Sequence, residues 1–163
     1  YIVSLDGLQN IPNIETVQTL NLGNNSLETI YPDTFNGLNA LRSLKLTYNS
    51  LETIHPGAFN GLNALTQLRL YNNRLETIHP DTFNGLNALT WLDLSNNSLV
   101  TIHPDTFNGL TALTKLWLND NNITHIDRET YGFIKSRRRN SIDRNITIVE
   151  SLINELPTAI EVA

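Results

Sequence analysis

The stretch LETIHPGAFNGLNAL at residues 51–65 decides the fold, because it returns as LETIHPDTFNGLNAL at residues 75–89, 24 positions further on. The same spacing extends in both directions along the chain, and it aligns two columns of leucines that stand two residues apart. Their members are Leu20, Leu44, Leu68, Leu92 and Leu116, then Leu22, Leu46, Leu70, Leu94 and Leu118. Self-similarity at a fixed period indicates a repeat architecture with five copies.

Three further kinds of column run through the same copies. An asparagine column stands where each chain segment leaves its leucine pair, so we expect its amides to bond to backbone groups that the turn leaves unpaired. An aromatic column is expected to fill the back of the core. The members are Asn25, Asn49, Asn73, Asn97 and Asn121; Phe35, Phe59, Phe83, Phe107 and Tyr131; and the aliphatic columns Leu27, Leu51, Leu75, Leu99, Ile123 and Ile30, Ile54, Ile78, Ile102, Ile126.

Written as one frame, the columns read LxxLxLxxNxLxxIxPxxFxxLxx, which resembles the typical 24-residue class of leucine-rich repeat over residues 17–134. Two leucines two residues apart point to one face of a short strand, and one repeat alone cannot bury them, so the copies must stack. The resemblance implies an α/β solenoid of horseshoe form. Its concave face is a parallel β-sheet, its convex face consists of turns and 3₁₀ segments, and its C-terminal cap is helical.

The two ends depart from the repeat, as the terminal caps of a solenoid must. We expect one domain divided into an N-terminal cap at 1–16, five repeats at 17–134 and a helical cap at 135–163. In the last segment, TIVESLINEL at 147–156 places its apolar residues on one helical face and predicts a capping helix. The basic run KSRRR at 135–139 is interpreted as the solvated face of the cap, although it also suits a nuclear address or a phosphate contact.

Composition restricts the partners. The chain has 163 residues, a formal net charge of −5, no cysteine and no methionine. We expect no nucleic-acid partner from this charge, and no membrane contact because no apolar run approaches the ~20 residues that cross a bilayer. The lack of cysteine favours a reducing compartment. Because Tyr1 is not an initiator methionine, residues upstream are expected to have been removed or left out, and the chain to be a fragment.

Comparison of the five copies predicts where binding takes place. The convex segments scarcely vary, whereas the outward positions of the strands vary completely and carry both tryptophans of the chain. Trp, Tyr and Arg are the typical anchors of protein interfaces, although aromatic residues also simply suit strands. The candidate partner-binding residues are Lys45, Tyr48, Arg69, Tyr71, Trp91, Asp93, Lys115, Trp117 and Asn119.

Catalysis and metal binding find no support in the residues. His55, His79 and His103 occupy the same position of successive copies, but a column of parallel imidazoles does not converge on one ion, so we interpret it as a structural ladder. The sequence contains no nucleophile elbow, phosphate-binding loop or zinc motif. We therefore predict a protein that is not an enzyme and needs no cofactor.

The resemblance extends to cysteine-free leucine-rich repeat effectors of intracellular bacteria. It implies a module that binds another folded protein, from host or bacterium, on its concave face and inhibits it. The chain itself is expected to be monomeric when free and to act in the host cytosol. Glycosylation acceptor patterns at Asn24 and Asn96 would obstruct this face in a secreted eukaryotic protein. An extracellular recognition or adhesion fragment and a consensus-engineered scaffold remain the alternatives.

Overall fold

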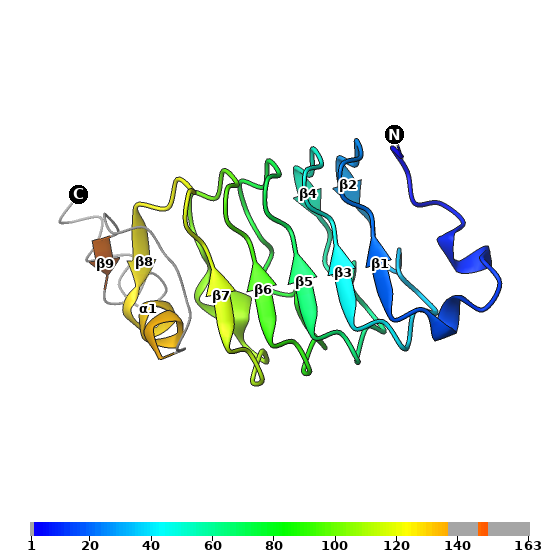
Figure 1. Ribbon diagram of the computed structural model, residues 1–163. Helices are drawn as coiled ribbons and strands as arrows, with labels where there is room; N and C mark the ends of the chain where they lie inside the picture. Colours follow the sequence, from blue (N-terminus) through cyan, green and yellow to red (C-terminus); the bar gives the residue numbers. More distant parts are fainter. Residues whose placement is uncertain (1, 137–146, 150–163) are drawn as a thin grey trace.

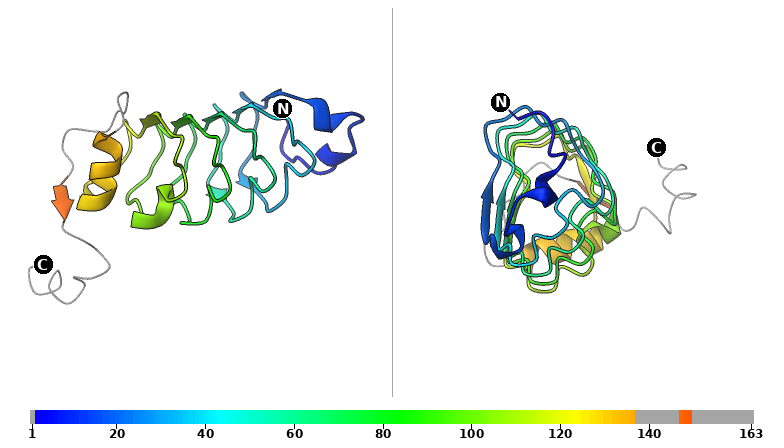
Figure 2. Two further views of the ribbon diagram at one scale, coloured as in Figure 1. Left: turned by 90° about the horizontal axis from the view of Figure 1, so that it is seen from below. Right: turned by 90° about the vertical axis from the view of Figure 1, so that its right-hand side faces the viewer.

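The computed structural model describes residues 2–136 and the backbone of 147–149 (Figure 1). Its main feature is a five-stranded parallel sheet in which neighbouring strands come from successive repeats and pair at equivalent positions of the repeat. The strands are β1 (Thr19–Asn21), β3 (Ser43–Lys45), β5 (Gln67–Arg69), β6 (Trp91–Asp93) and β7 (Lys115–Trp117). This confirms the predicted solenoid, and Figure 2 shows its repeats as coils around one common axis.

The core lies between the sheet and the opposite, convex side. The central leucine of each of the strands β3, β5, β6 and β7 is fully buried. Behind them the phenylalanine rings stack in parallel, with centroids 6.0 Å apart for Phe35 and Phe59, 6.3 Å for Phe59 and Phe83, and 6.5 Å for Phe83 and Phe107. The predicted aromatic spine is confirmed for these four residues.

The asparagine column forms a continuous hydrogen-bonded ladder. Asn73 donates through Nδ2 to the carbonyls of Leu70 and Leu46, at 2.9 and 3.0 Å, and its Oδ1 accepts the amide N–H of Leu51 at 3.0 Å. The carbonyl of Leu46 also accepts from Asn49 of the preceding repeat. Because each such carbonyl is shared by two asparagines, the ladder joins every repeat to the next, as it also does at Asn97 and Asn121.

A second, two-stranded parallel sheet is not predicted by the sequence pattern. It pairs β2 (Thr29–Ile30) with β4 (Thr53–Ile54), and each strand ends two residues before a proline, Pro32 or Pro56. A proline has no N–H to continue a ladder, so the chain turns instead. The convex segment that follows is a turn in most repeats and a 3₁₀ helix at η3 (Pro104–Phe107), in agreement with prediction.

Atypical segments close both ends of the repeat stack. At the start, η1 (Leu8–Asn10) and η2 (Ile14–Thr16) place Ile14 against the core. At the other end, β8 (His125–Asp127) leads into α1 (Arg128–Lys135), a C-terminal helix that lies, except for Lys135, at residues assigned by prediction to the fifth repeat. None of the helices in residues 2–136 is long and apolar enough to span a membrane.

The aromatic spine ends differently from the prediction. Phe133, on α1, stacks on Phe107 with ring centroids 5.8 Å apart, whereas Tyr131 is half-exposed beneath the ammonium group of Lys135. The side chain of Asp127 accepts the N–H of Thr130 and starts a helix at this point. Because the chain is helical here, the ring that reaches Phe107 belongs to Phe133, two residues later than predicted. The assignment of Tyr131 to the spine is therefore wrong.

Residues 147–149 also depart from prediction. Thr147–Val149 form strand β9, parallel to β8, with Ile148 opposite Ile126. Three successive β-branched residues favour a strand over the first turn of a helix, and the free edge of β8 offers them a partner. The predicted helix is therefore wrong at 147–149. Its remainder at 150–156 and Arg137–Arg139 of the basic run lie outside the described residues.

Replacement of Asn73 by alanine tests the ladder. Asn73→Ala removes three hydrogen bonds and leaves the buried amide of Leu51 without an acceptor, so the free energy of unfolding should fall by about 2–4 kcal/mol. Chemical denaturation measures this change. Asn87→Ala, at an exposed position of the same repeat, is the matched control and should stay within about 0.5 kcal/mol of the native chain. Equal effects of the two variants would contradict the role of the ladder.

Candidate functional site

The solvent side of the five-stranded sheet, which we call the concave face, gathers the predicted site residues. Strands β3, β5 and β7 bury their central leucine and turn their two flanking residues outward. The register places these residues in two rows across the strands. One row contains Ser43, Gln67, Trp91 and Lys115, and the other contains Lys45, Arg69, Asp93 and Trp117.

The last three strands of the sheet, β5, β6 and β7, carry a cluster formed by Arg69, Trp91, Lys115 and Trp117, which we call the Trp91 cluster. The guanidinium carbon of Arg69 lies 4.2 Å from the centroid of the Trp91 ring, and Nζ of Lys115 lies 4.6 Å from it. These cations come from the strands on either side of β6. The ring of Trp117 meets that of Trp91 edge-on, with centroids 5.3 Å apart. Cation–π contacts of this kind fix long basic side chains in place.

A second aromatic pair lies where two strands end. The rings of Tyr48 and Tyr71 meet edge-on at 5.4 Å, and Tyr48 is 51% exposed. Tyr48 also has a left-handed backbone, with φ of 55°. The other four repeats have Asn or Asp at this position, with similar φ values. These residue types tolerate the conformation, whereas a bulky side chain is strained in it.

Asp93 corrects the expectation that it projects freely from the sheet. It is only 3% exposed, and its Oδ1 accepts the backbone N–H and the hydroxyl of Ser95, at 3.1 and 2.6 Å. Burial raises the pKa of the Asp93 carboxyl, against the opposing effects of the Ser95 hydrogen bonds and the positive charge of Arg69. Its neighbours in the register are the large side chains of Arg69 and Trp117. The alternation of residues along the strand predicts that Asp93 lies on the concave face, but it does not predict that neighbouring side chains bury it.

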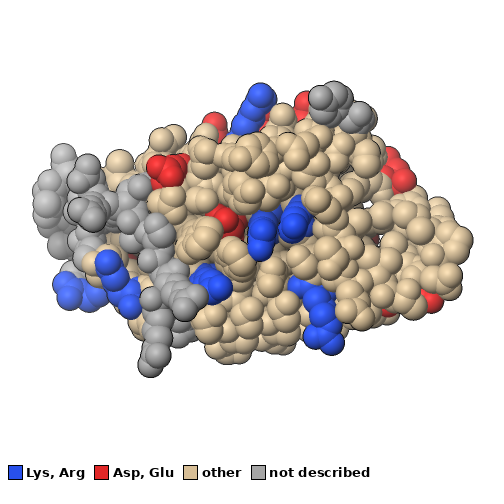
Figure 3. All heavy atoms as spheres, in the orientation of Figure 1, with Lys and Arg blue, Asp and Glu red and all other residues tan. Residues whose placement is uncertain are grey.

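The exposed charge of the face is positive. Lys45, Arg69 and Lys115 make no ion pair with any residue of the described part of the chain. Figure 3 looks onto this face and shows basic side chains over the central strands, with a small acidic area beside them. At its rim, Asn119 donates to the carboxylate of Asp120. The face thus differs in sign from the whole chain, whose net charge is −5.

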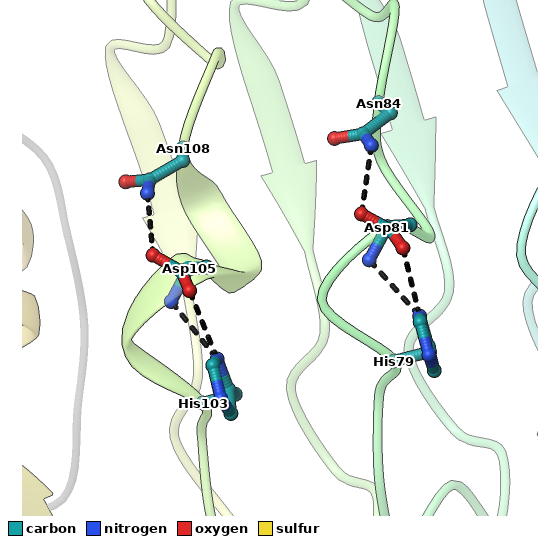
Figure 4. A network of polar contacts seen from close by, with 6 residues as sticks. All are labelled: His79, Asp81, Asn84, His103, Asp105 and Asn108. Carbon is teal, nitrogen blue, oxygen red and sulfur yellow. Dashed lines mark hydrogen bonds and ion pairs between the residues drawn. The ribbon is translucent and has the colours of Figure 1, made fainter. Parts of the chain in front are cut away.

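The histidines lie on the other side of the molecule, where they cap the convex turns (Figure 4). Nδ1 of His79 accepts the backbone N–H of Asp81 at 3.1 Å, and Asp81 in turn accepts from Asn84 at 2.9 Å. The carboxylate of Asp81 lies 3.7 Å from the same Nδ1. Because the lone pair of Nδ1 is already used, this close approach is not an ion pair in the neutral ring. The next repeat has the same arrangement at His103 and Asp105.

The described residues hold no metal site, and they form a hollow away from the concave face. Within the described residues no group of three His, Cys, Asp or Glu side chains is placed to hold a metal ion. A hollow of about 620 Å³, which sequence reasoning missed, lies between residues 3–9 and 26–34 near the N-terminus. None of the predicted site residues lines it. It arises where the N-terminal segment leaves the first repeat, and no residue pattern signals it.

Comparison with known proteins agrees with this geometry. Leucine rich repeat models match residues 15–75, 65–123 and 89–132. The chain belongs to the leucine-rich repeat family. Domains of this family are typically protein-interaction modules and are generally non-catalytic, and no enzyme family matches.

Solved structures place the chain among longer proteins. The crystal structure of a TLR13–ssRNA13 complex superimposes with a TM-score of 0.69 and 28% sequence identity, over 90% of this chain and 23% of TLR13. The chain therefore spans about a quarter of that protein. No curated protein sequence matches it.

The strain at Tyr48 can be measured with two substitutions that both remove the ring. Tyr48→Asn places a residue tolerant of positive φ there, whereas Tyr48→Ala retains the backbone penalty. We expect the asparagine variant to be more stable by about 1 kcal/mol, measured by chemical denaturation. Equal stabilities would show that Tyr48 is not strained.

Proposed function

We propose that this leucine-rich repeat chain is a non-catalytic module that binds a folded protein through its concave face. The observation that carries the proposal is the Trp91 cluster, in which aromatic rings and cations from three neighbouring strands meet on one face. Clustered aromatic and arginine anchors are typical of interface hot spots. The near-constant convex segments supply no comparable grouping.

The dimensions of the face support a protein partner. Five strands about 4.8 Å apart, each contributing about five residues of roughly 3.3 Å, give a flat area of roughly 400 Å². A standard interface covers about 800 Å² on each partner. The side chains at the ends of the strands, including Tyr48, Tyr71 and Asn119, must therefore join the contact.

The biological setting forms the finer part of the proposal: a bacterial effector that enters a host cell and inhibits its partner by covering the partner's working surface. The lack of cysteine supports a reducing compartment. Asn24 and Asn96, which carry glycosylation acceptor patterns, are exposed three residues after the ends of β1 and β6. Glycans there would obstruct the concave face, so the proposal places the chain where they are not attached.

An extracellular recognition fragment is the second candidate. It is favoured by the 28% identity to part of TLR13, whose structure is a complex with ssRNA13. This candidate predicts that the chain forms part of a longer receptor. The same resemblance makes RNA an outcome that the experiments must be able to detect.

Capture from host-cell lysate tests the proposal. The native chain, Trp91→Ala/Trp117→Ala and the control Tyr31→Ala are compared, because Tyr31 is an exposed aromatic residue away from the concave face. A partner identified with the native chain should bind the double variant about thirtyfold more weakly or worse, and the control unchanged. Thermal unfolding verifies that each variant is folded. Undiminished binding by a folded double variant would place the site elsewhere.

A further inference from the structure

We infer that the Trp91 cluster recognises a carboxylate, presented by an aspartate or glutamate side chain of the protein partner. This inference rests on the proposed function and names the chemistry of the group that the concave face receives. It depends on three observations. Two cations of the cluster form no ion pair with a described residue, two of its N–H groups have no hydrogen-bond acceptor there, and its aromatic rings are in contact with cations or with each other.

Neither cation forms an ion pair with a described residue. Arg69 and Lys115 lie against the same ring, at 4.2 and 4.6 Å from its centroid, and they come from the strands on either side of it. The nearest acidic group in the register is Asp93, but it is buried and its Oδ1 is engaged by Ser95. An anion from outside would supply the ion-pair partner that both cations lack within the described residues.

Two N–H donors in the cluster are unused. Nε of Arg69 and Nε1 of Trp91 are buried and have no hydrogen-bond partner in the described part of the chain. The guanidinium makes only a long contact, 3.5 Å, to the side chain of Gln67. Buried donors without acceptors destabilise the free protein. The planar guanidinium of arginine suits the two oxygens of a carboxylate, which would satisfy Nε after a small shift of the side chain.

The surroundings of the rings favour a protein carboxylate over a nucleic acid. Base stacking needs free aromatic faces, but Trp91 is covered by two cations, and both aromatic pairs of the concave face meet edge-on. A long polyanion would also be repelled by the net charge of −5. A single carboxylate on a folded partner avoids this repulsion.

Intrinsic fluorescence reports on the site directly, because the only two tryptophans of the 163 residues both belong to the cluster. The full chain is titrated at low salt with a capped hexaglutamate peptide, a capped hexaglutamine peptide and a uridine decamer RNA. Hexaglutamate should change the emission saturably and bind at least about tenfold more tightly than hexaglutamine.

A charge-matched pair of variants makes the test specific. Arg69→Gln/Lys115→Gln should weaken hexaglutamate binding about tenfold or more. Arg42→Gln/Arg74→Gln removes the same charge outside the cluster and should change it less than about twofold. Both variants retain the basic run at 135–139, so binding there cannot separate them. Thermal unfolding confirms that both are folded.

Three results would overturn the inference: no saturable response to hexaglutamate, equal weakening in the two variants, or tighter binding of the RNA. The first two leave the proposed function standing if a protein partner still depends on Trp91 and Trp117. Conversely, loss of that dependence with hexaglutamate binding intact would count against the proposed function alone.

Discussion

The rest of the structure depends on one interaction, the asparagine side chain that holds the backbone of two successive repeats. Each leucine carbonyl at the end of a strand accepts from two such asparagines, so the hydrogen bonds run without a break from Leu22 to Leu94. Stacked repeats contact only their neighbours, and each neighbouring contact must therefore be strong on its own. The leucines and phenylalanines supply the buried apolar surface of the core, while the asparagines fix how each repeat is aligned with the next.

Because the ladder and the core specify the fold, the outward positions of the strands are free to differ. They are also where the molecule keeps unfavourable features: a strained Tyr48, the buried carboxyl of Asp93 and the unused N–H groups of Arg69 and Trp91. Each of these costs stability, and none is needed to build a repeat, since other copies lack them. Their presence in and beside the Trp91 cluster is what selection for binding would produce.

Much of this architecture was predictable from spacing alone. The repeat period predicted the sheet, its register and the stacked rings from Phe35 to Phe107. In near-identical repeats, equivalent residues take equivalent positions and pack against one another. Prediction failed where repetition ends. Phe133 replaced Tyr131 once the chain became helical, and Thr147–Val149 found the edge of β8, a contact that no local pattern reveals.

The same limit applies to the candidate site. Alternation along the strands identified the face and its aromatic and basic residues, but the burial of Asp93 depends on the sizes of its cross-strand neighbours. The small sheet of β2 and β4 was missed because two-residue strands carry no periodicity. The hollow near the N-terminus depends on the path of a non-repeating segment, for which the five copies offer no comparison.

Native-state hydrogen exchange tests the central role of the asparagine ladder most directly. The amides of Leu51, Leu75 and Leu99 are bonded to asparagine side chains of the following repeat, at 3.0–3.1 Å. If the ladder holds the repeats together, these amides should exchange as slowly as the sheet amides of Leu46 and Leu70, through global unfolding. Exchange at the rate of exposed turn amides would contradict this account.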